Sequence, residues 1–519
     1  KIYLEAAIDY TRDFGPHFVT GLLLGNRQHR QLHNDALAFR KESFVGRGTY
    51  TYDNRYTVEF NFGVTGSEQF AKGHRYGFFP AVGLAWNISS EPYFPYALLD
   101  VVSNLRVRAS VGRTGNDATG GARFMYMPTF GDSGSYAWGI TSGGTQNSMS
   151  GLIENRFESP GLSWEIEDKR NIGIDLGLWN NRVDISVDFF DDERSNILLQ
   201  RRTVLNIAGF RQNPWQNYGI VSNKGLDGSV NLNHIIGDFK LSAKGTLTYA
   251  RNKILEYDEL PQLYPWMERT GKRLVNHGSQ LPLIAERLFT EDDFNITTDA
   301  NGRKLYELKD GLVGTPWDTN TYPGDIKYMD INGDGLLDDK DRVYDPDGFH
   351  PQVPEAVYGF GFGLDWKGLY FNAFFQGVAN VTVNMNSSTS VFQPFYWGLI
   401  ESNVRQEFVE DRWTQENQNP NAFYPRLRIS NTGNNWTSST YWYRNGNFLR
   451  FKNLEFGYNF QKELLSKVGL SASRIYVSGH NLHVWDHVKM FDPEIGNSGG
   501  GGTRYPLSRT WTMGLEVTF

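Results

Sequence analysis

The sequence lacks cysteine, lacks long apolar runs and carries no excess of positive charge. The absence of cysteine fits an oxidising envelope compartment, where stray thiols are a liability. No stretch reaches the roughly 18 consecutive apolar residues of a transmembrane helix, which excludes a helical membrane protein. The chain has 51 Lys and Arg against 58 Asp and Glu, a net charge of -7, which argues against nucleic acid as a partner.

The sequence also lacks the common catalytic motifs. No H-E-x-x-H motif and no phosphate-binding glycine loop occurs. The acidic pairs Asp191-Asp192 and Asp292-Asp293 fall near strand ends or in loops, where solvated surface is expected rather than acid–base catalysis. His480 and His483 are three residues apart across a predicted strand end, so we expect them on opposite faces and not as a metal pair. We therefore predict that the protein is not an enzyme.

Aromatic residues and glycine are abundant, and apolar residues alternate with polar ones. Aromatics make up 15% of the chain, with 14 Trp and 55 Gly. The last eleven residues, 509–519, read R-T-W-T-M-G-L-E-V-T-F and place Trp511, Met513, Leu515, Val517 and Phe519 on one side of a strand. A terminal amphipathic strand that ends on an aromatic residue is typical of a bacterial outer-membrane barrel, in which one face meets lipid and the other lines the lumen.

Similar alternation recurs at 56–64, 171–178, 183–189, 239–249 and 358–366. A soluble β-sandwich or propeller would show the same periodicity. The lengths of the connections between strands distinguish these folds from a membrane barrel. About 15 strands, each near the ~9–11 residues that a tilted membrane strand needs, are joined alternately by short and long connections. The short ones fall at 13–16, 53–55, 180–182, 236–238 and 366–368, with somewhat longer ones on the same side at 91–102 and 461–473. The long ones fall near 29–41, 66–78, 114–166, 193–215, 252–354, 379–447 and 483–508.

Short turns on one rim and long loops on the other are the outer-membrane pattern. The predicted fold is therefore all-β, a transmembrane antiparallel β-barrel over residues 1–519, in the outer membrane of a Gram-negative cell. The residues expected to face lipid are Ile172, Ile174, Val183, Ile185, Trp511 and Met513, and those expected to face the lumen are Asp175, Asp184 and Asp188. Bacterial single-chain barrels have an even number of strands, so an odd count of about 15 leads us to expect missing N-terminal sequence. The missing signal peptide and the start at Lys1 lead to the same expectation.

Several segments carry a family resemblance in the expected order along the chain. They are G-F-F-P-A-V-G-L-A-W-N-I-S-S-E-P-Y-F (77–94), L-R-V-R-A-S-V-G-R-T-G-N-D (105–117), N-I-G-I-D-L-G-L-W-N-N-R-V-D-I-S-V-D-F-F-D (171–191), G-D-I-K-Y-M-D-I-N-G-D-G-L-L-D-D-K-D-R (324–342), N-F-L-R-F-K-N-L-E-F-G-Y (447–458), S-G-H-N-L-H-V-W (478–485), F-D-P-E (491–494) and Y-P-L-S-R-T-W-T-M-G-L-E-V-T-F (505–519). Together they resemble the SusC/RagA-type TonB-dependent transporters of Bacteroidetes outer membranes. The resemblance implies a barrel of 22 strands closed by an N-terminal plug, of which this chain would be the C-terminal part, without the plug or the TonB box.

The resemblance also implies a function. We expect TonB-dependent active import of oligosaccharides or oligopeptides, together with a SusD-like surface lipoprotein and with TonB acting through the missing plug segment. A dimer of transporter–lipoprotein pairs is a further expectation. The alternatives are a passive porin, a surface-adhesive barrel and, more remotely, a soluble enzyme. The sequence upstream of Lys1 would separate the importer from the porin.

Aromatic residues in the long loops are candidates for ligand binding. Flat aromatic faces stack on sugar rings and pack against peptide side chains. The alternatives for any one of them are an interfacial aromatic girdle or packing against the partner lipoprotein. The candidates are Trp266, Phe395, Tyr396, Trp397, Tyr441, Trp442 and Tyr443.

The loop 330–341, D-I-N-G-D-G-L-L-D-D-K-D, is a candidate calcium site. Its oxygen donors stand at EF-hand-like spacing, with Gly335 at the sharp turn and the apolar Leu337 as an anchor. Hard oxygen ligands without His or Cys suit Ca²⁺, for which we expect a structural role. Asp341 replaces the usual bidentate Glu, so affinity is expected to be weak, at roughly 10⁻⁴–10⁻³ M. The alternative is a metal-free loop held by Asx turns. The predicted ligands are Asp330, Asn332, Asp334, Leu336 (through its carbonyl), Asp338 and Asp341.

Overall fold

The computed structural model describes residues 1–31, 38–120, 122–141, 143–275, 280–317, 320–387, 406–428, 433–495 and 505–519. The chain divides into two compact units. The first unit contains Lys1–Asn233 and Ala250–Leu260, and the second contains His234–Tyr249 and Pro261–Phe519. Within the described ranges, none of the helices has the length and apolar character needed to cross a membrane.

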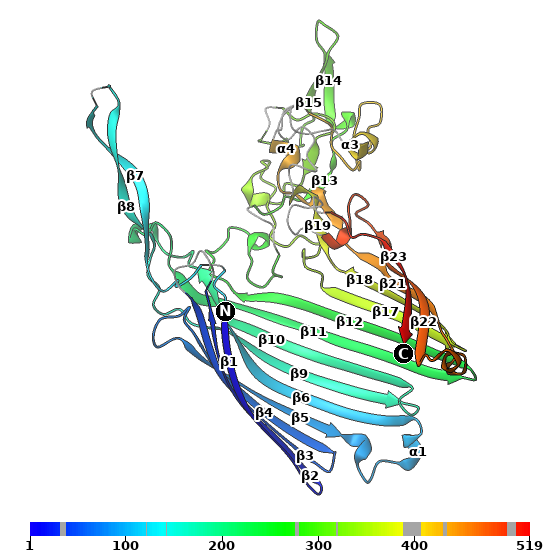
Figure 1. Ribbon diagram of the computed structural model, residues 1–519. Coiled ribbons are helices and arrows are strands. Elements are labelled where there is room, and N and C mark those ends of the chain that lie inside the picture. The colour runs from blue at the N-terminus through cyan, green and yellow to red at the C-terminus, as the bar shows by residue number, and fades with distance from the viewer. Residues whose placement is uncertain are drawn as a thin grey trace. The chain divides into compact units, whose positions relative to one another are not determined.

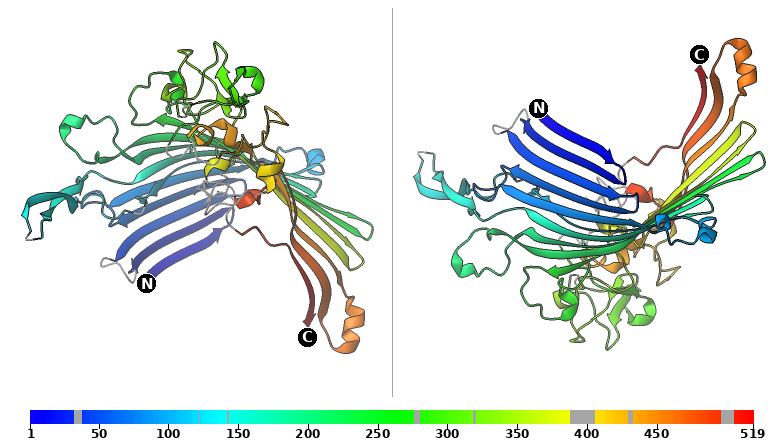
Figure 2. Two further views of the ribbon diagram at one scale, coloured as in Figure 1. Left: turned by 90° about the horizontal axis from the view of Figure 1, so that it is seen from above. Right: turned by 90° about the horizontal axis from the view of Figure 1, so that it is seen from below.

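Fifteen long strands form one antiparallel sheet in which neighbours in space follow the order of the chain (Figure 1). In the first unit the N-terminal strands lie side by side in both views of Figure 2. This arrangement confirms the prediction of an all-β fold with about 15 antiparallel strands. The strands are β1 (Ile2–Phe14), β2 (His17–Arg30), β3 (Phe39–Tyr52), β4 (Tyr56–Ser67), β5 (Tyr76–Asn87), β6 (Val102–Asn116), β9 (Glu165–Leu178), β10 (Val183–Gln200), β11 (Trp215–Ile236), β12 (Phe239–Glu256), β17 (Ala356–Trp366), β18 (Leu369–Ala379), β21 (Phe448–Asn459), β22 (Ala472–Asp486) and β23 (Thr510–Thr518).

The short connections are tight hairpin turns, and their residues explain why. Asn180 and Asn181, between β9 and β10, have φ of 58° and 57°. Asp53 and Asn54, between β3 and β4, have φ of 50° and 54°. Hairpin turns of type I′, whose twist matches that of the flanking strands, need positive φ at both central positions, and Asn and Asp tolerate it better than other residues with a Cβ. The hairpin predicted at 180–182 is confirmed.

The register of the strands separates their side chains onto two faces. Ile172, Ile174 and Leu176 of β9 pair with Phe189, Val187 and Ile185 of β10, all on one face of the sheet. The residues between them lie on the other face, where Asp175 pairs with Ser186 and Asp188 pairs with Gly173. We name these the apolar face and the polar face. Asp184 and Ile185 lie on opposite faces, as the alternation predicted.

The long connections contain further structure that the sequence did not indicate. In the first unit, a two-stranded hairpin of β7 (Thr129–Ile140) and β8 (Gln146–Arg156) lies between β6 and β9. In the second unit, three small two-stranded sheets pair β13 with β16, β14 with β15 and β19 with β20. Most of these strands have three to five residues, too few to show a period of two. Their bounds are β13 (Ala285–Leu288), β14 (Phe294–Thr298), β15 (Lys304–Leu308), β16 (Ile326–Tyr328), β19 (Thr382–Asn384) and β20 (Tyr443–Asn445), and the short helices are α1 (Tyr96–Leu99), α3 (Gln406–Glu410), α4 (Gly433–Trp436) and α5 (Lys462–Leu465).

The second unit has its own hydrophobic core, formed by the loops and not by the sheet. We name the described parts of 261–355, 380–447 and 487–495 the loop assembly. Side chains from all three segments meet in this core, among them Leu283, Trp442 and Val488, each at most 1% exposed. A smaller buried cluster in the first unit joins Phe70, Met125, Leu162 and Trp164. The other buried members of the loop-assembly core, in the second unit, are Leu288, Ile326, Tyr328, Leu337, Val383, Met385, Phe408, Trp413, Ala422 and Tyr424.

Candidate transport surface and loop sites

The polar face of the first unit carries a cluster centred on Arg108 of β6. Its guanidinium donates to Asp175 at 2.8 and 2.9 Å and to Asp188 at 2.9 and 3.0 Å. Ser186 donates to the Asp175 carboxylate at 2.8 Å. The register places these residues together, because Arg108 pairs with Gly173 and Asp188 pairs with the same glycine from the other side. A Cβ at Gly173 would lie 2.4 Å from the Asp188 carboxylate and 2.8 Å from the guanidinium, so the cluster needs glycine there.

The polar face of the second unit has a comparable arrangement near the C-terminus. Arg474 of β22 donates to Glu516 of β23 at 2.7 Å and lies 3.7 Å from Glu455 of β21. Tyr370 of β18 donates to Glu455 at 2.8 Å. Both units therefore line their polar faces with charged side chains of both signs. Such a surface suits water and polar solutes, and not lipid.

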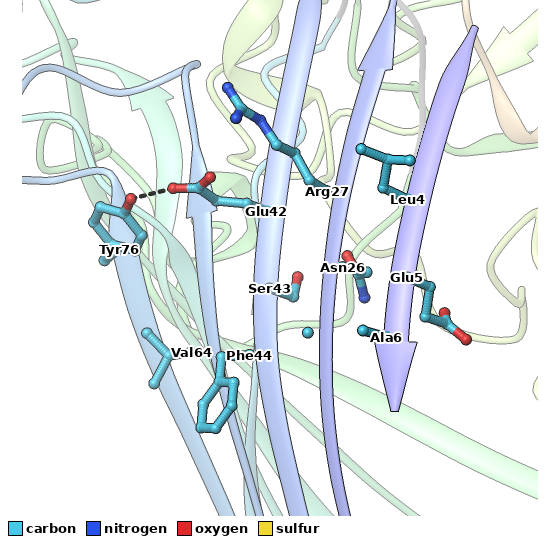
Figure 3. Close-up of a pocket in the computed structure, with 11 residues that line it drawn as sticks. Leu4, Glu5, Ala6, Asn26, Arg27, Glu42, Ser43, Phe44, Val64 and Tyr76 are labelled. Atoms are coloured by element: carbon cyan, nitrogen blue, oxygen red, sulfur yellow. Dashed lines mark hydrogen bonds between the residues drawn. The ribbon is translucent and has the colours of Figure 1, made fainter. Parts of the chain in front are cut away.

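Two grooves lie on the apolar face of the first unit. One, of about 490 Å³, is bordered by Leu4, Arg27, Glu42, Phe44 and Tyr76 (Figure 3). The other has about 510 Å³ and lies over β5, β6, β9 and β10. Their apolar linings face away from the Arg108 cluster, because their residues alternate with those of the polar face. Neither groove is therefore a candidate site for a polar transported substrate.

The predicted ligand-binding aromatics differ in their surroundings. Trp442 is fully buried, stacks on Trp436 with ring centroids 4.5 Å apart, and donates to the Asn435 carbonyl at 2.9 Å. Tyr443 is 7% exposed, and burial raises its pKa. These contacts account for both residues through packing, and a role for them in ligand binding stays a prediction.

The other described aromatics of this set are more accessible. Trp266 is half-buried, stacks on Tyr264 with an interplanar angle of 6°, and donates to the Lys340 carbonyl at 2.8 Å. Tyr441 is half-buried, donates to the Ala422 carbonyl at 2.7 Å, and has its pKa raised by burial. Phe395, Tyr396 and Trp397 lie outside the described residues. The structure thus brings Trp266 next to the predicted calcium loop, through its hydrogen bond to Lys340.

The loop 330–341 folds as a turn around its own carboxylates. Asp330 accepts hydrogen bonds from the Gly333 and Gly335 amides, each at 2.8 Å, and Gly335 has a φ of 78°. Asp341 is fully buried and accepts from the Ile331 and Asp338 amides, each at 2.9 Å. The expected apolar anchor, Leu337, is buried in the core of the loop assembly.

A lysine lies among the remaining acidic groups of this loop. The Lys340 ammonium is 3.2 Å from Asp334 and 3.1 Å from Asp338, and these two carboxylates raise its pKa. Backbone and side-chain hydrogen bonds lower the pKa of Asp334. In the part of the chain that the structure describes, no three His, Asp or Glu side chains are grouped as metal ligands. The predicted calcium ligation is therefore not preformed in this geometry and stays a prediction.

His480 and His483, which we expected on opposite faces of their strand, have different contacts. His480 contacts the Asn453 side chain at 2.8 Å, whereas the His483 ring packs edge-on against Trp485 at 4.6 Å.

The sequence did not identify the ionic cluster at Asp325, whose side chain is fully buried. Asp325 accepts from Arg426 at 2.7 Å and from the Asn435 side chain at 3.0 Å. These partners are about a hundred residues away, so spacing along the chain gives no signal for the cluster.

Comparison with known proteins agrees with this geometry. The scan of protein-family models gives no match. The TonB-dependent receptor P26 of Formosa agariphila is 28% identical over 513 residues, which cover 94% of this chain and 47% of that protein. The TonB-dependent receptor SusC of Bacteroides thetaiotaomicron is 25% identical over 482 residues, which cover 92% of this chain and 43% of SusC. A solved structure of the RagAB peptide transporter superposes with a TM-score of 0.70 at 20% identity, covering 100% of this chain and 55% of that chain.

The chain is related to the TonB-dependent receptors of the SusC/RagA type. The resemblance read from the sequence is thus confirmed, as is the fold class. The relatives and the fold also confirm the predicted location in the outer membrane, so the apolar face of the sheet meets lipid. The chain spans about half the length of the curated relatives that it matches. The matched proteins are named receptors and transporters.

Proposed function

We propose that the protein takes part in TonB-dependent import of oligosaccharides or oligopeptides across the outer membrane. The observation that carries this proposal is the fifteen-stranded sheet with one apolar and one polar face, whose fold matches the RagAB peptide transporter over the whole chain. Charged groups of both signs on the polar face, such as Arg108 and Arg474 with their acids, suit the passage of hydrated, hydrogen-bonding substrates.

Uptake by whole cells tests this function. Cells that carry the full-length protein are given fluorescent oligosaccharides and oligopeptides of matched size, with and without TonB. An importer takes up one class only when TonB is present. A passive porin shows uptake that does not depend on TonB, and an adhesive barrel binds the probe without internalising it. Either of these results contradicts the proposal.

A SusD-like lipoprotein is proposed as the partner at the loops, with TonB acting through a plug segment outside this chain. Exposed apolar side chains on the β7–β8 hairpin support such a cover, since Tyr136, Ile140 and Leu152 are 74%, 73% and 77% exposed. Mass spectrometry of complexes purified from membranes tests the partner, and the native mass tests a dimer of transporter–lipoprotein pairs. Recovery of the barrel alone contradicts both expectations.

Trp266 is the aromatic residue that we propose for substrate contact in the loop assembly. Its stacked pair with Tyr264 offers a rigid, half-buried aromatic surface, of the kind that binds sugar rings or apolar peptide side chains. Trp266→Ala is expected to lower substrate affinity at least tenfold, which is about 1.4 kcal/mol. Trp485→Ala, on the strand β22, is the control and leaves affinity unchanged. Equal losses in the two variants contradict the role of Trp266.

We further propose that the loop 330–341 binds calcium after Lys340 moves away from Asp334 and Asp338. Support comes from the turn at Gly335, the anchored Leu337 and the approach of Asp334 and Asp338 to the same Lys340 ammonium. Titration calorimetry of the full-length protein is expected to show binding at roughly 10⁻⁴–10⁻³ M, lost in Asp334→Asn. Asp299→Asn, in another loop whose carboxylate caps backbone amides, is the control. No calcium-dependent heat at millimolar calcium contradicts the site.

A further inference from the structure

A phenylalanine stands on the polar face of the sheet in the second unit. Phe374 follows Tyr370 by an even number of residues in the regular pairing of β18 with β17, so both lie on the polar face. Its chain neighbour Phe375 lies on the apolar face and stacks on Phe360 and Phe451, with ring centroids 5.0 and 4.5 Å apart. Among the described residues, the Phe374 ring contacts no other aromatic ring. The girdle of stacked aromatics on the apolar face therefore does not account for it.

Two glycines and a lysine position the Phe374 ring. A Cβ at Gly359 would lie 3.0 Å from the ring atom Cζ, and a Cβ at Gly361 would lie 3.2 Å from Cδ2. One edge of the ring thus runs along the backbone of β17, in space that the two glycines leave open. The Lys244 ammonium lies 5.0 Å from the ring centroid. The ring is half-buried in this position, so part of its surface stays accessible.

Polar side chains surround the ring on the same face. Asn372 and Gln376 precede and follow Phe374 by two residues along β18, and Asn453 of β21 is its cross-strand partner. Lys244 of β12 lies on the side of β17. Among the described residues, the side chains of Asn372 and Gln376 have no hydrogen-bond partner and Lys244 forms no ion pair. Their donors and acceptors are therefore open to a solute on the polar face.

An aromatic surface with polar groups on every side fits a solute that is apolar on one face only. A pyranose ring has this form, because C–H groups cover one face and hydroxyls surround the rim. Side-chain amides both donate and accept hydrogen bonds, as hydroxyls do. An apolar peptide side chain lacks such a rim, and it would bury the surrounding amides without partners, which is costly. The surroundings of Phe374 therefore favour a sugar over a peptide side chain.

We propose that Phe374 forms a sugar-binding subsite on the polar face of the sheet. The inference rests on the proposed import function and names oligosaccharides as the substrate class. The C–H face of one pyranose ring stacks on Phe374. Asn372, Gln376 and Lys244 bind the hydroxyls at its rim. This contact lies on the strands, apart from the one proposed for Trp266 in the loop assembly.

Sugar binding by the purified full-length protein tests the subsite. The protein is titrated with a pool of neutral oligosaccharides released from starch, mannan and galactan, and native mass spectrometry counts what is bound. Phe374→Leu keeps an apolar side chain but removes the flat ring, and is expected to weaken binding about tenfold. Phe374→Tyr restores the ring and is expected to bind within about threefold of the unmodified protein.

The same substitution at the next residue is the matched control. Phe375→Leu changes the apolar face and is expected to leave sugar binding unchanged, and thermal unfolding checks that all three variants fold. Equal binding by Phe374→Leu and Phe375→Leu overturns the proposal. Binding of peptides from a casein digest, with none of the oligosaccharides bound, overturns it as well.

Uptake by whole cells separates this subsite from the import function. Cells with and without TonB receive the oligosaccharide pool and the casein peptides. If the unmodified protein imports neither, the proposed function is contradicted, whereas a binding loss confined to Phe374→Leu still supports the subsite. If Phe374→Leu instead gains uptake that does not depend on TonB, the ring seals the barrel against a plug segment, and the sugar-binding role is wrong.

Discussion

The apolar face of the sheet and the core of the loop assembly contain the same kinds of side chain in opposite surroundings. On the sheet, Ile172, Met513 and Leu515 leave 58%, 72% and 66% of their surface uncovered by protein. In the loop assembly, Leu283 and Leu288 are fully buried. Lipid covers the first set, and other side chains cover the second. Apolar side chains are therefore left uncovered by protein where lipid surrounds the sheet, and are buried where the loops pack on one another.

Charged groups differ between the same two regions. The Arg108 cluster on the polar face is partly exposed, with 30% of the arginine side chain accessible. Asp325 in the loop assembly is fully buried, and its side-chain partners among the described residues are Arg426 and Asn435. Loss of one partner should therefore cost more in the loop assembly than on the sheet.

The largest expected effect comes from breaking the buried ionic cluster. Asp325→Asn leaves Arg426 without its acid and is expected to lower the free energy of unfolding of the loop assembly by about 3–5 kcal/mol. Urea denaturation of the full-length protein in detergent, followed by tryptophan fluorescence, measures the loss. The matched variant Asp175→Asn, whose arginine keeps Asp188, is expected to lose less than about 1 kcal/mol. Equal losses would show that the two charge clusters are equally buried.

A leucine-to-alanine pair compares the two apolar regions directly. Leu283→Ala removes a fully buried side chain and leaves a cavity, so about 2–5 kcal/mol of stability is expected to be lost. Leu515→Ala, on the lipid-facing side of β23, is expected to lose only about 1–2 kcal/mol, because fluid lipid fills the space and only the transfer contribution remains. The same denaturation experiment measures both. A larger loss for Leu515→Ala would contradict lipid contact at that face.

A charge placed on each face of the sheet tests the assignment of the faces. Ile174→Arg on the apolar face is expected to cost about 2–4 kcal/mol in a bilayer. Ser110→Arg on the polar face is expected to change stability by less than about 0.5 kcal/mol. Refolding into lipid vesicles at a series of urea concentrations gives both values. If the two costs are reversed, the polar face meets lipid and the assignment is wrong.

The smallest expected effect is a pH dependence of the loop assembly. The pKa of Glu291 is lowered to about 2 from an ordinary value near 4.5, first by its hydrogen bond from Lys304, then by those from Tyr306 and Gln418. A lowered pKa means that the carboxylate stabilises the folded state fully above its ordinary value, and that this contribution is lost as the pH falls toward 2.

The variant Glu291→Gln isolates this contribution. It is expected to lose about 1.5 kcal/mol at neutral pH, the lower end of the range for a hydrogen bond to a charged group, because the side chain is partly exposed. It is also expected to show a flatter stability profile between pH 4.5 and 2. Thermal unfolding across that range measures the profile. A variant whose profile stays parallel to that of the unmodified protein assigns the acid sensitivity to other carboxylates.

Much of the sheet could be predicted because its information is local. The alternation in 171–178 and 183–189 fixes which side chains share a face, and Asn180 and Asn181 fix the hairpin that sets the register. Once the register is given, the pairing of Arg108 with Asp175 and Asp188 follows. The sequence shows these charges on the polar face but does not show which of them meet.

The loop assembly could not be predicted in the same way. Leu283, Trp442 and Val488 are separated by more than forty residues at each step, yet they share one core. The sequence makes Trp442 a ligand-binding candidate but gives no signal that it is buried in this core, against Trp436. Trp266, in a different segment, is half-buried beside the loop 330–341.

The sequence by itself determined the fifteen-stranded antiparallel sheet, the two faces of each strand and the outer-membrane location, because a period of two and tight turns are properties of neighbouring residues. Only the tertiary structure decided which apolar side chains are covered by protein and which charges are paired. Those contacts join segments that are distant along the chain, and burial is a property of the whole surrounding and not of the residue.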